Sequence, residues 1–93
     1  MSDYKYYVGT PVSREGVGSA IISFDQSCVV FELVNRSTVV GETVKFKTKD
    51  MYYFSPFVQA GESLKLPLDR FTEIEIITSN SNVPFTWLAY TVS

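Results

Sequence analysis

The stretch Thr43-Val44-Lys45-Phe46-Lys47-Thr48-Lys49 alternates between residues that favour burial and residues that carry charge. Successive side chains of a β-strand point to opposite sides of the sheet, so Val44, Phe46 and Thr48 share one side while the lysines share the other. The pattern therefore predicts a strand with one side in the core and one side in water.

The same two-residue period recurs along most of the chain, and no stretch of ten residues has the 3.6-residue period of a helix. Residues 28–35 are almost wholly apolar, which predicts a central strand covered on both sides. Residues 9–18 contain Gly9, Pro11, Gly16 and Gly18, which predict a loop. The remaining predicted strands are residues 4–8, 19–24, 51–58, 63–66, 71–78 and 85–92.

Seven or eight short strands, with no helix to carry a parallel crossover, predict an all-β antiparallel fold. A small jelly-roll-like β-sandwich is favoured over a closed barrel, because several strands look apolar on one side only. The polar run Ser79-Asn80-Ser81-Asn82 predicts the turn of a final hairpin. With 93 residues, the chain is predicted to form a single domain over residues 1–93.

The last predicted strand is apolar on both sides. Trp87 shares one side with Phe85 and Ala89, and this side is predicted to face the core. The opposite side carries Leu88, Tyr90 and Val92 and needs a cover, either residues 4–8 or a neighbouring subunit. A neighbouring subunit is the favoured cover.

Two adjacent tyrosine pairs also point to a partner. In an extended strand one member of each pair faces away from the core, and tyrosine is favoured in protein interfaces and sugar-binding platforms. The alternative is that the rings lie flat over the ends of the sandwich. The predicted interface residues are Tyr6, Tyr7, Tyr52, Tyr53 and Tyr90.

The chain contains no histidine, which removes imidazole acid–base catalysis and most zinc sites. Cys28 is the only cysteine and lies in an apolar run, so it is predicted to be an inert core residue. Glu73 and Glu75 share one side of a strand, but a solvated face paired with lysines explains them better than a pair of catalytic carboxylates. We therefore expect no enzyme activity, no catalytic residue, no metal and no cofactor.

Three lysines at positions 45, 47 and 49, with tyrosines nearby, resemble a surface that binds single-stranded nucleic acid. The net charge of −2 argues against that function, so an exposed strand face is the favoured interpretation. The triplet Asn35-Arg36-Ser37 matches a glycosylation acceptor but is predicted to be a turn.

The start Met-Ser-Asp-Tyr-Lys lacks the features of a secretion signal, and no apolar run approaches the length of a membrane span. Together with the single cysteine, this predicts a soluble protein made in a reducing cytoplasm.

The order of turns and strands in residues 57–67, 71–77 and 83–90 resembles small accessory proteins of tailed-phage virions. The resemblance implies a capsid decoration (cement-like) or similar structural subunit, which would bind its partners through exposed aromatic side chains and strand edges. It also implies a homo-oligomer or a protein partner. The alternative functions are a carbohydrate- or small-ligand-binding sandwich that uses the tyrosines and Trp87, and a nucleic-acid-binding domain.

Overall fold

The structure is a computed structural model that describes residues 10–48 and 53–92. Within these residues all regular secondary structure is β, which confirms the predicted all-β class. The strands form one antiparallel sheet in the order β1-β6-β2-β5-β3-β4. Their bounds are β1 Thr10–Val17, β2 Ala20–Asn35, β3 Thr43–Thr48, β4 Val58–Gln59, β5 Ser63–Thr78 and β6 Pro84–Val92.

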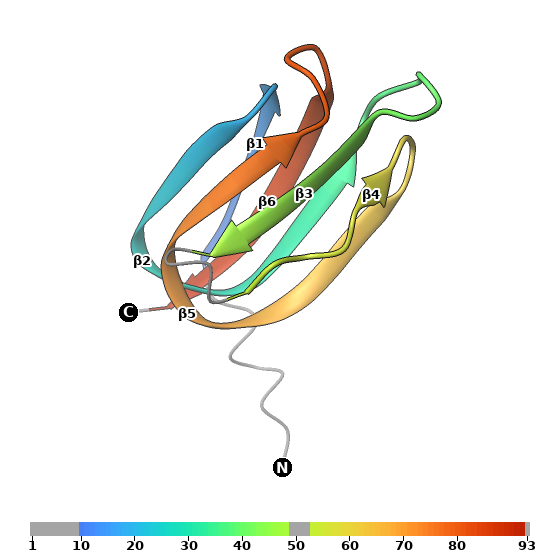
Figure 1. Ribbon diagram of the computed structural model, residues 1–93. Helices are drawn as coiled ribbons and strands as arrows, with labels where there is room; N and C mark the ends of the chain where they lie inside the picture. The colour runs from blue at the N-terminus through green and yellow to red at the C-terminus, as the bar shows by residue number, and fades with distance from the viewer. Residues whose placement is uncertain (1–9, 49–52, 93) are drawn as a thin grey trace.

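The long strands β2 and β5 curl round one end of the molecule, so the sheet folds over into two layers (Figure 1). The first half of β2 pairs with the second half of β5, and the second half of β2 pairs with β6 and the first half of β5. One layer therefore contains β1, β6 and the adjoining halves of β2 and β5, and the other contains the remaining halves with β3 and β4. This arrangement is the predicted β-sandwich, and among the described strands β1 and β4 leave its sheet open at both edges.

Both bends have a local cause. In β2 the pairing with β5 shifts register between Ser23 and Cys28, and such irregularities bend a strand. In β5, Arg70 has a left-handed backbone with φ of 57°. Each bent strand was predicted as two shorter strands, residues 19–24 and 28–35 in β2 and residues 63–66 and 71–78 in β5, which left residues 25–27 and 67–70 outside the predicted strands. They are bends within continuous strands, which is why six strands occupy the described residues.

The loop predicted over residues 9–18 is wrong for its described part. Residues 10–17 form β1, which pairs with β6 along its whole length, from Thr10 opposite Thr91 to Val17 opposite Pro84. Proline and glycine are tolerated there because β1 is an edge strand. Gly16 also makes room for an aromatic ring, since a Cβ at this position would lie 2.6 Å from Cζ of Phe85.

The predicted final hairpin is also wrong, because β2 lies between β5 and β6 in the sheet. The turn at residues 79–83 instead carries the chain from one layer to the other. Its turn chemistry is as predicted, with the backbone N–H of Asn82 donating to Oδ1 of Asn80 at 2.8 Å. A polar turn of this kind can join two paired strands in a hairpin or two strands in different layers, so its sequence did not distinguish these two connections.

The core lies between the two layers and is rich in aromatic rings. Trp87 is 8% exposed, as predicted for a core residue, and stacks on Phe31 with ring centroids 5.9 Å apart. Phe24 meets Trp87 edge-on at 5.6 Å, and Phe46 meets Phe31 edge-on at 4.9 Å. Edge-to-face pairs of this kind add to the free energy gained by burying the rings.

Several predictions fall outside the described residues: the strand at residues 4–8, Tyr6, Tyr7, Lys49 and Tyr52. Within residues 10–48 and 53–92, the structure contains no helix that could span a membrane.

Candidate functional site

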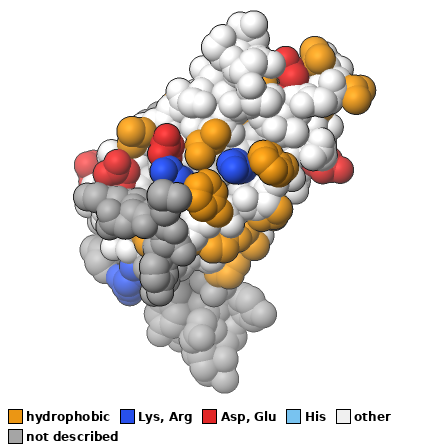
Figure 2. Space-filling model, viewed as in Figure 1, with side chains coloured by type: hydrophobic (Ala, Val, Ile, Leu, Met, Phe, Trp, Pro, Cys, Tyr) orange, Lys and Arg blue, Asp and Glu red, His pale blue; other side chains and the backbone are white. Residues whose placement is uncertain are grey.

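The outer side of the second layer carries lysines among exposed apolar side chains (Figure 2). Its central row crosses four segments of chain, because Ile21 pairs with Glu75, Glu75 with Lys47, and Lys47 with Phe54. A second row places Ile77 beside Lys45. We call this surface the Lys–Phe face, and its members are Ile21, Lys45, Lys47, Phe54, Phe57, Glu75 and Ile77.

The central row contains an ion pair. Nζ of Lys47 lies 3.2 Å from Oε1 of Glu75 on the neighbouring strand, which confirms the predicted cross-strand pairing of lysine and glutamate. Lys47 also lies 5.8 Å from the ring centroid of Phe54. An ion pair near the surface contributes about 0.2–1 kcal/mol to the free energy of unfolding, so this pair adds little to the stability of the fold.

Lys45 lies between two aromatic rings. Its Nζ is 4.8 Å from the ring centroid of Phe54 and 4.6 Å from that of Phe57, and both distances suit cation–π attraction. The rings themselves are open to solvent, with Phe54 40% and Phe57 60% exposed. Large aromatic side chains with this exposure offer apolar area to a partner.

Ser55 holds the segment that carries the two phenylalanines. Its backbone N–H donates to the carbonyl oxygen of Phe46 at 2.8 Å, and its hydroxyl accepts from the backbone N–H of Phe46 at 2.9 Å. The hydroxyl of Ser55 is thus the hydrogen-bond acceptor for the N–H of Phe46, a role that a backbone carbonyl of the neighbouring strand normally has in a sheet. Pro56 follows, has no N–H to donate, and interrupts the pairing with β3, which resumes at Val58 opposite Val44. Alternation then breaks, so Pro56 and Phe57 are both exposed before Val58 returns to the core.

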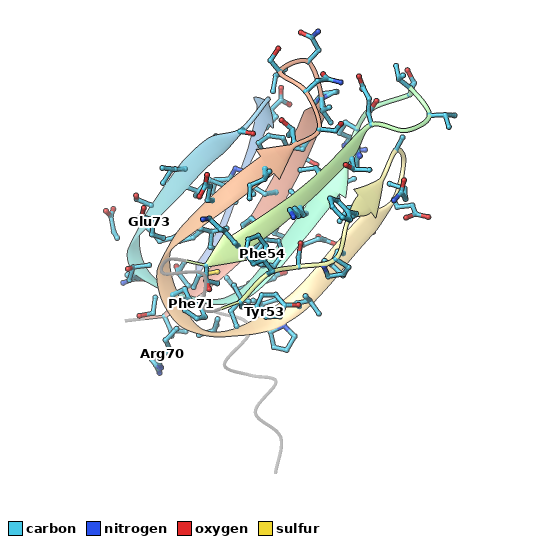
Figure 3. All side chains as sticks on the ribbon, viewed as in Figure 1. Tyr53, Phe54, Arg70, Phe71 and Glu73 are labelled. Atoms are coloured by element: carbon cyan, nitrogen blue, oxygen red, sulfur yellow. The ribbon has the colours of Figure 1, made fainter. Side chains whose placement is uncertain are left out.

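The two described tyrosines of the predicted interface lie on different layers. Tyr53 turns inward and its ring lies 5.9 Å from that of Phe46, while its neighbour Phe54 is exposed on the face (Figure 3). Tyr90 is half-buried on the outer side of the first layer, where Nζ of Lys65 lies 5.8 Å from its ring centroid. The structure does not bring these tyrosines together, and their role in an interface stays a prediction.

Phe54 and Phe57 were not among the predicted site residues. The strand predicted over residues 51–58 was expected to lie at an edge or to bend at Pro56, and no side of the sheet was assigned to the residues after the proline. Unbroken alternation from Tyr53 would place Phe57 inside, and the break at Pro56 reverses this. Pro56 is the sequence signal that the strand is interrupted, but a proline does not determine which side of the sheet the following residues take.

The open end of the sandwich is held by polar contacts. The side chain of Asn35 is fully buried, so the triplet Asn35-Arg36-Ser37 is not a glycosylation acceptor. The carboxylate of Glu42 accepts hydrogen bonds from the hydroxyl of Ser37 and from Nδ2 of Asn80, and these bonds lower its pKa. This cluster joins the loop between β2 and β3 to the turn between β5 and β6, and its groups are bonded to one another, which marks it as structural.

No reactive group stands out elsewhere in the described residues. The thiol of Cys28 is buried and donates to the carbonyl oxygen of Val30 at 3.4 Å, and burial raises its pKa to about 12, as expected for an inert core cysteine. In the described part of the chain no three His, Cys, Asp or Glu residues gather as a metal site would require. A shallow depression on the first layer is lined by Glu15, Glu32, Val34, Arg36, Thr86, Trp87 and Leu88.

No protein-family model matches the sequence, and no curated protein matches it. Among solved structures, a chain from the disulfide-linked pili of Bacillus endospore appendages is 18% identical, with a TM-score of 0.53 over 90% of this chain and 87% of that one. The Drosophila NLP core, from a structure concerned with pentamer formation and histone binding, is 10% identical, with a TM-score of 0.55 over 90% of this chain and 99% of that one. Similarity at this level shows a shared fold.

Proposed function

We propose that this chain is a non-enzymatic structural subunit that acts through protein–protein contacts made by the Lys–Phe face. The observation that carries the proposal is the clustering of Ile21, Phe54 and Phe57, which are 64%, 40% and 60% exposed, around one ion pair on one side of the sheet. A pleated sheet surface of this kind suits another protein surface better than a small molecule, since small ligands are generally held in concave sites.

The specific setting we propose is a virion, where the chain would act as a decoration (cement-like) subunit. The support for this setting is the resemblance of residues 57–67, 71–77 and 83–90 to small accessory proteins of tailed-phage virions. The fold is compatible with such a role, because a pilus chain and a chain from a structure about pentamer formation share it. Folds host many functions, so the setting rests on the resemblance and the face together.

Two other functions are weaker. Exposed rings beside Lys45 could stack on a sugar, which keeps carbohydrate binding as the second candidate. Nucleic-acid binding is disfavoured because Lys47 is already paired with Glu75, and because the chain as a whole is negatively charged.

Light scattering over a range of protein concentrations tests the proposal. We expect the wild type to associate, and the double variant Phe54→Ser/Phe57→Ser to associate at least tenfold more weakly while it keeps its fold. The matched control is Val39→Ser/Val40→Ser, which also removes two exposed apolar side chains but in the loop between β2 and β3, outside the Lys–Phe face. A wild type that stays monomeric at about 1 mM, or binding on a glycan array that the phenylalanine variant loses, would contradict the proposal.

A further inference from the structure

We infer that the Lys–Phe face is the contact surface of a two-fold symmetric dimer of this chain, with β3 of each copy lying over β5 of the other. This inference rests on the proposed function and names the partner of the same surface. It follows from the order of side chains across the central row of the face.

The row reads apolar, acidic, basic, apolar. Its members are Ile21 on β2, Glu75 on β5, Lys47 on β3, and Phe54 beside β3, each the register partner of the next. Such a row is complementary to itself when it is turned end for end. A two-fold axis between β3 and β5, parallel to them, makes that turn and brings the two sheets face to face.

The turn places Glu75 of one copy over Lys47 of the other, and Lys47 over Glu75. Each copy already holds Lys47 and Glu75 3.2 Å apart, so the four groups would form a square in which every charge has opposite charges on both sides. Four alternating charges withdrawn from water together avoid leaving any one of them unpaired, which is the main cost of burying charge at an interface.

The ends of the row also match. Ile21 of one copy comes over Phe54 of the other, and both are exposed in the single chain, at 64% and 40%. In the next row, where Ile77 is the register partner of Lys45, the same turn brings Lys45 of one copy over Ile77 of the other. The ammonium group of Lys45 stays between the rings of Phe54 and Phe57, and Phe57, which is 60% exposed, extends the apolar border on that side. An interface with paired charges at its axis and apolar side chains on both flanks shields the charges from solvent and so strengthens their attraction.

Charge-reversal variants test the symmetry directly. Lys47→Glu places two carboxylates against each other at both contacts across the axis, and Glu75→Lys places two ammonium groups against each other in the same way. Each variant alone should therefore dimerise at least about 100-fold more weakly than the wild type. An equimolar mixture of the two variants can form a dimer that has only opposite charges across the axis. Sedimentation velocity should show that dimer in the mixture, with an affinity within about tenfold of the wild type.

The matched control is Lys65→Glu, since Lys65 and Glu32 form a comparable register pair on the outer side of the other layer. This variant should dimerise like the wild type, and circular dichroism should show that all the variants keep the wild-type fold. If the wild type associates and the Phe54/Phe57 variant weakens that association, but both charge variants associate normally or their mixture does not recover, the two-fold dimer is wrong and the proposed function stands. A wild type that is monomeric at about 1 mM overturns both.

Discussion

At the scale of single residues, Asn35 connects three separate parts of the chain. Its Nδ2 donates to the carbonyl oxygens of Glu42 and Val58 at 3.0 and 2.9 Å, and its Oδ1 accepts from the backbone N–H of Ser37 at 2.9 Å. The side chain is fully buried, so water cannot replace these bonds. Asn35 therefore fixes the end of β2 to the loop that follows it and to β4.

We predict that Asn35→Ala lowers the free energy of unfolding by about 3 kcal/mol, because it leaves buried backbone groups without partners. Urea denaturation measures the change. The control is Asn80→Ala, which removes hydrogen bonds at an exposed turn and should cost less than about 1 kcal/mol. Equal losses of unfolding free energy in the two variants would show that the buried hydrogen bonds of Asn35 stabilise the fold no more than the exposed ones of Asn80.

Cys28 provides a pH-dependent prediction. An exposed thiol ionises near pH 9.0, whereas burial raises the pKa of Cys28 to about 12. The unfolded chain therefore loses this proton first, so the stability that the neutral thiol provides is complete below pH 9 and is lost as the pH rises toward 12. Wild type should be more stable than Cys28→Ala at pH 7, and this advantage should shrink between pH 9 and 12. A constant difference in denaturation midpoint across that range would contradict the burial of the thiol.

At the scale of strands, the pairing of β1 with β6 depends on Gly16. A Cβ at this position would lie 2.6 Å from Cζ of Phe85, and the Phe85 ring is held in the core. We predict that Gly16→Ala lowers the free energy of unfolding by about 1–3 kcal/mol through this overlap. Adding Phe85→Leu should recover part of that loss, because the shorter side chain leaves room for the methyl group. A double-mutant cycle measures the coupling, and strictly additive losses would show that the two residues do not clash.

The strands also show how far the sequence predicts the fold. Alternation correctly assigned the inner and outer residues of β3, the second half of β5 and β6, because each of these has one side against the core. It missed β1, where Pro11 and Gly16 read as a loop although an edge strand accepts both. The turn at residues 79–82 led to the prediction that β5 pairs with β6, whereas β2 lies between them in the sheet. Which strands pair depends on the packing of the whole core, and the turn between two strands does not determine it.

For the candidate site, the lysines and Glu75 could be predicted and the phenylalanines could not. Lys45, Lys47 and Glu75 follow from simple alternation and from the expected pairing of opposite charges across a sheet. The exposure of Phe57 depends on a break in the ladder at Pro56 and on a hydroxyl of Ser55 that replaces a backbone acceptor. The hydrogen bond from the backbone N–H of Phe46 to the hydroxyl of Ser55 is a tertiary contact, and a single sequence does not reveal such contacts.

At the scale of the whole molecule, neither layer can unfold without the other, because β2 and β5 belong to both. We predict a single cooperative transition on denaturation. Fluorescence of Trp87, the only tryptophan, reports on the packing between the layers, and far-UV circular dichroism reports on the strands. The two curves should coincide, and a separate earlier transition in either signal would show that one layer melts alone.

The pairing of β1 with β6 has a mechanical consequence. Thr10 at the start of β1 lies opposite Thr91 near the end of β6, so the two ends of the described domain enter the same end of one ladder. Tension applied between these ends would pull the strands apart sideways and break their hydrogen bonds one pair at a time, as a zipper opens, instead of loading them all together in shear. A filament or shell built from this subunit would therefore resist stretching better if force passed through the broad faces of the sandwich than if it passed along the chain.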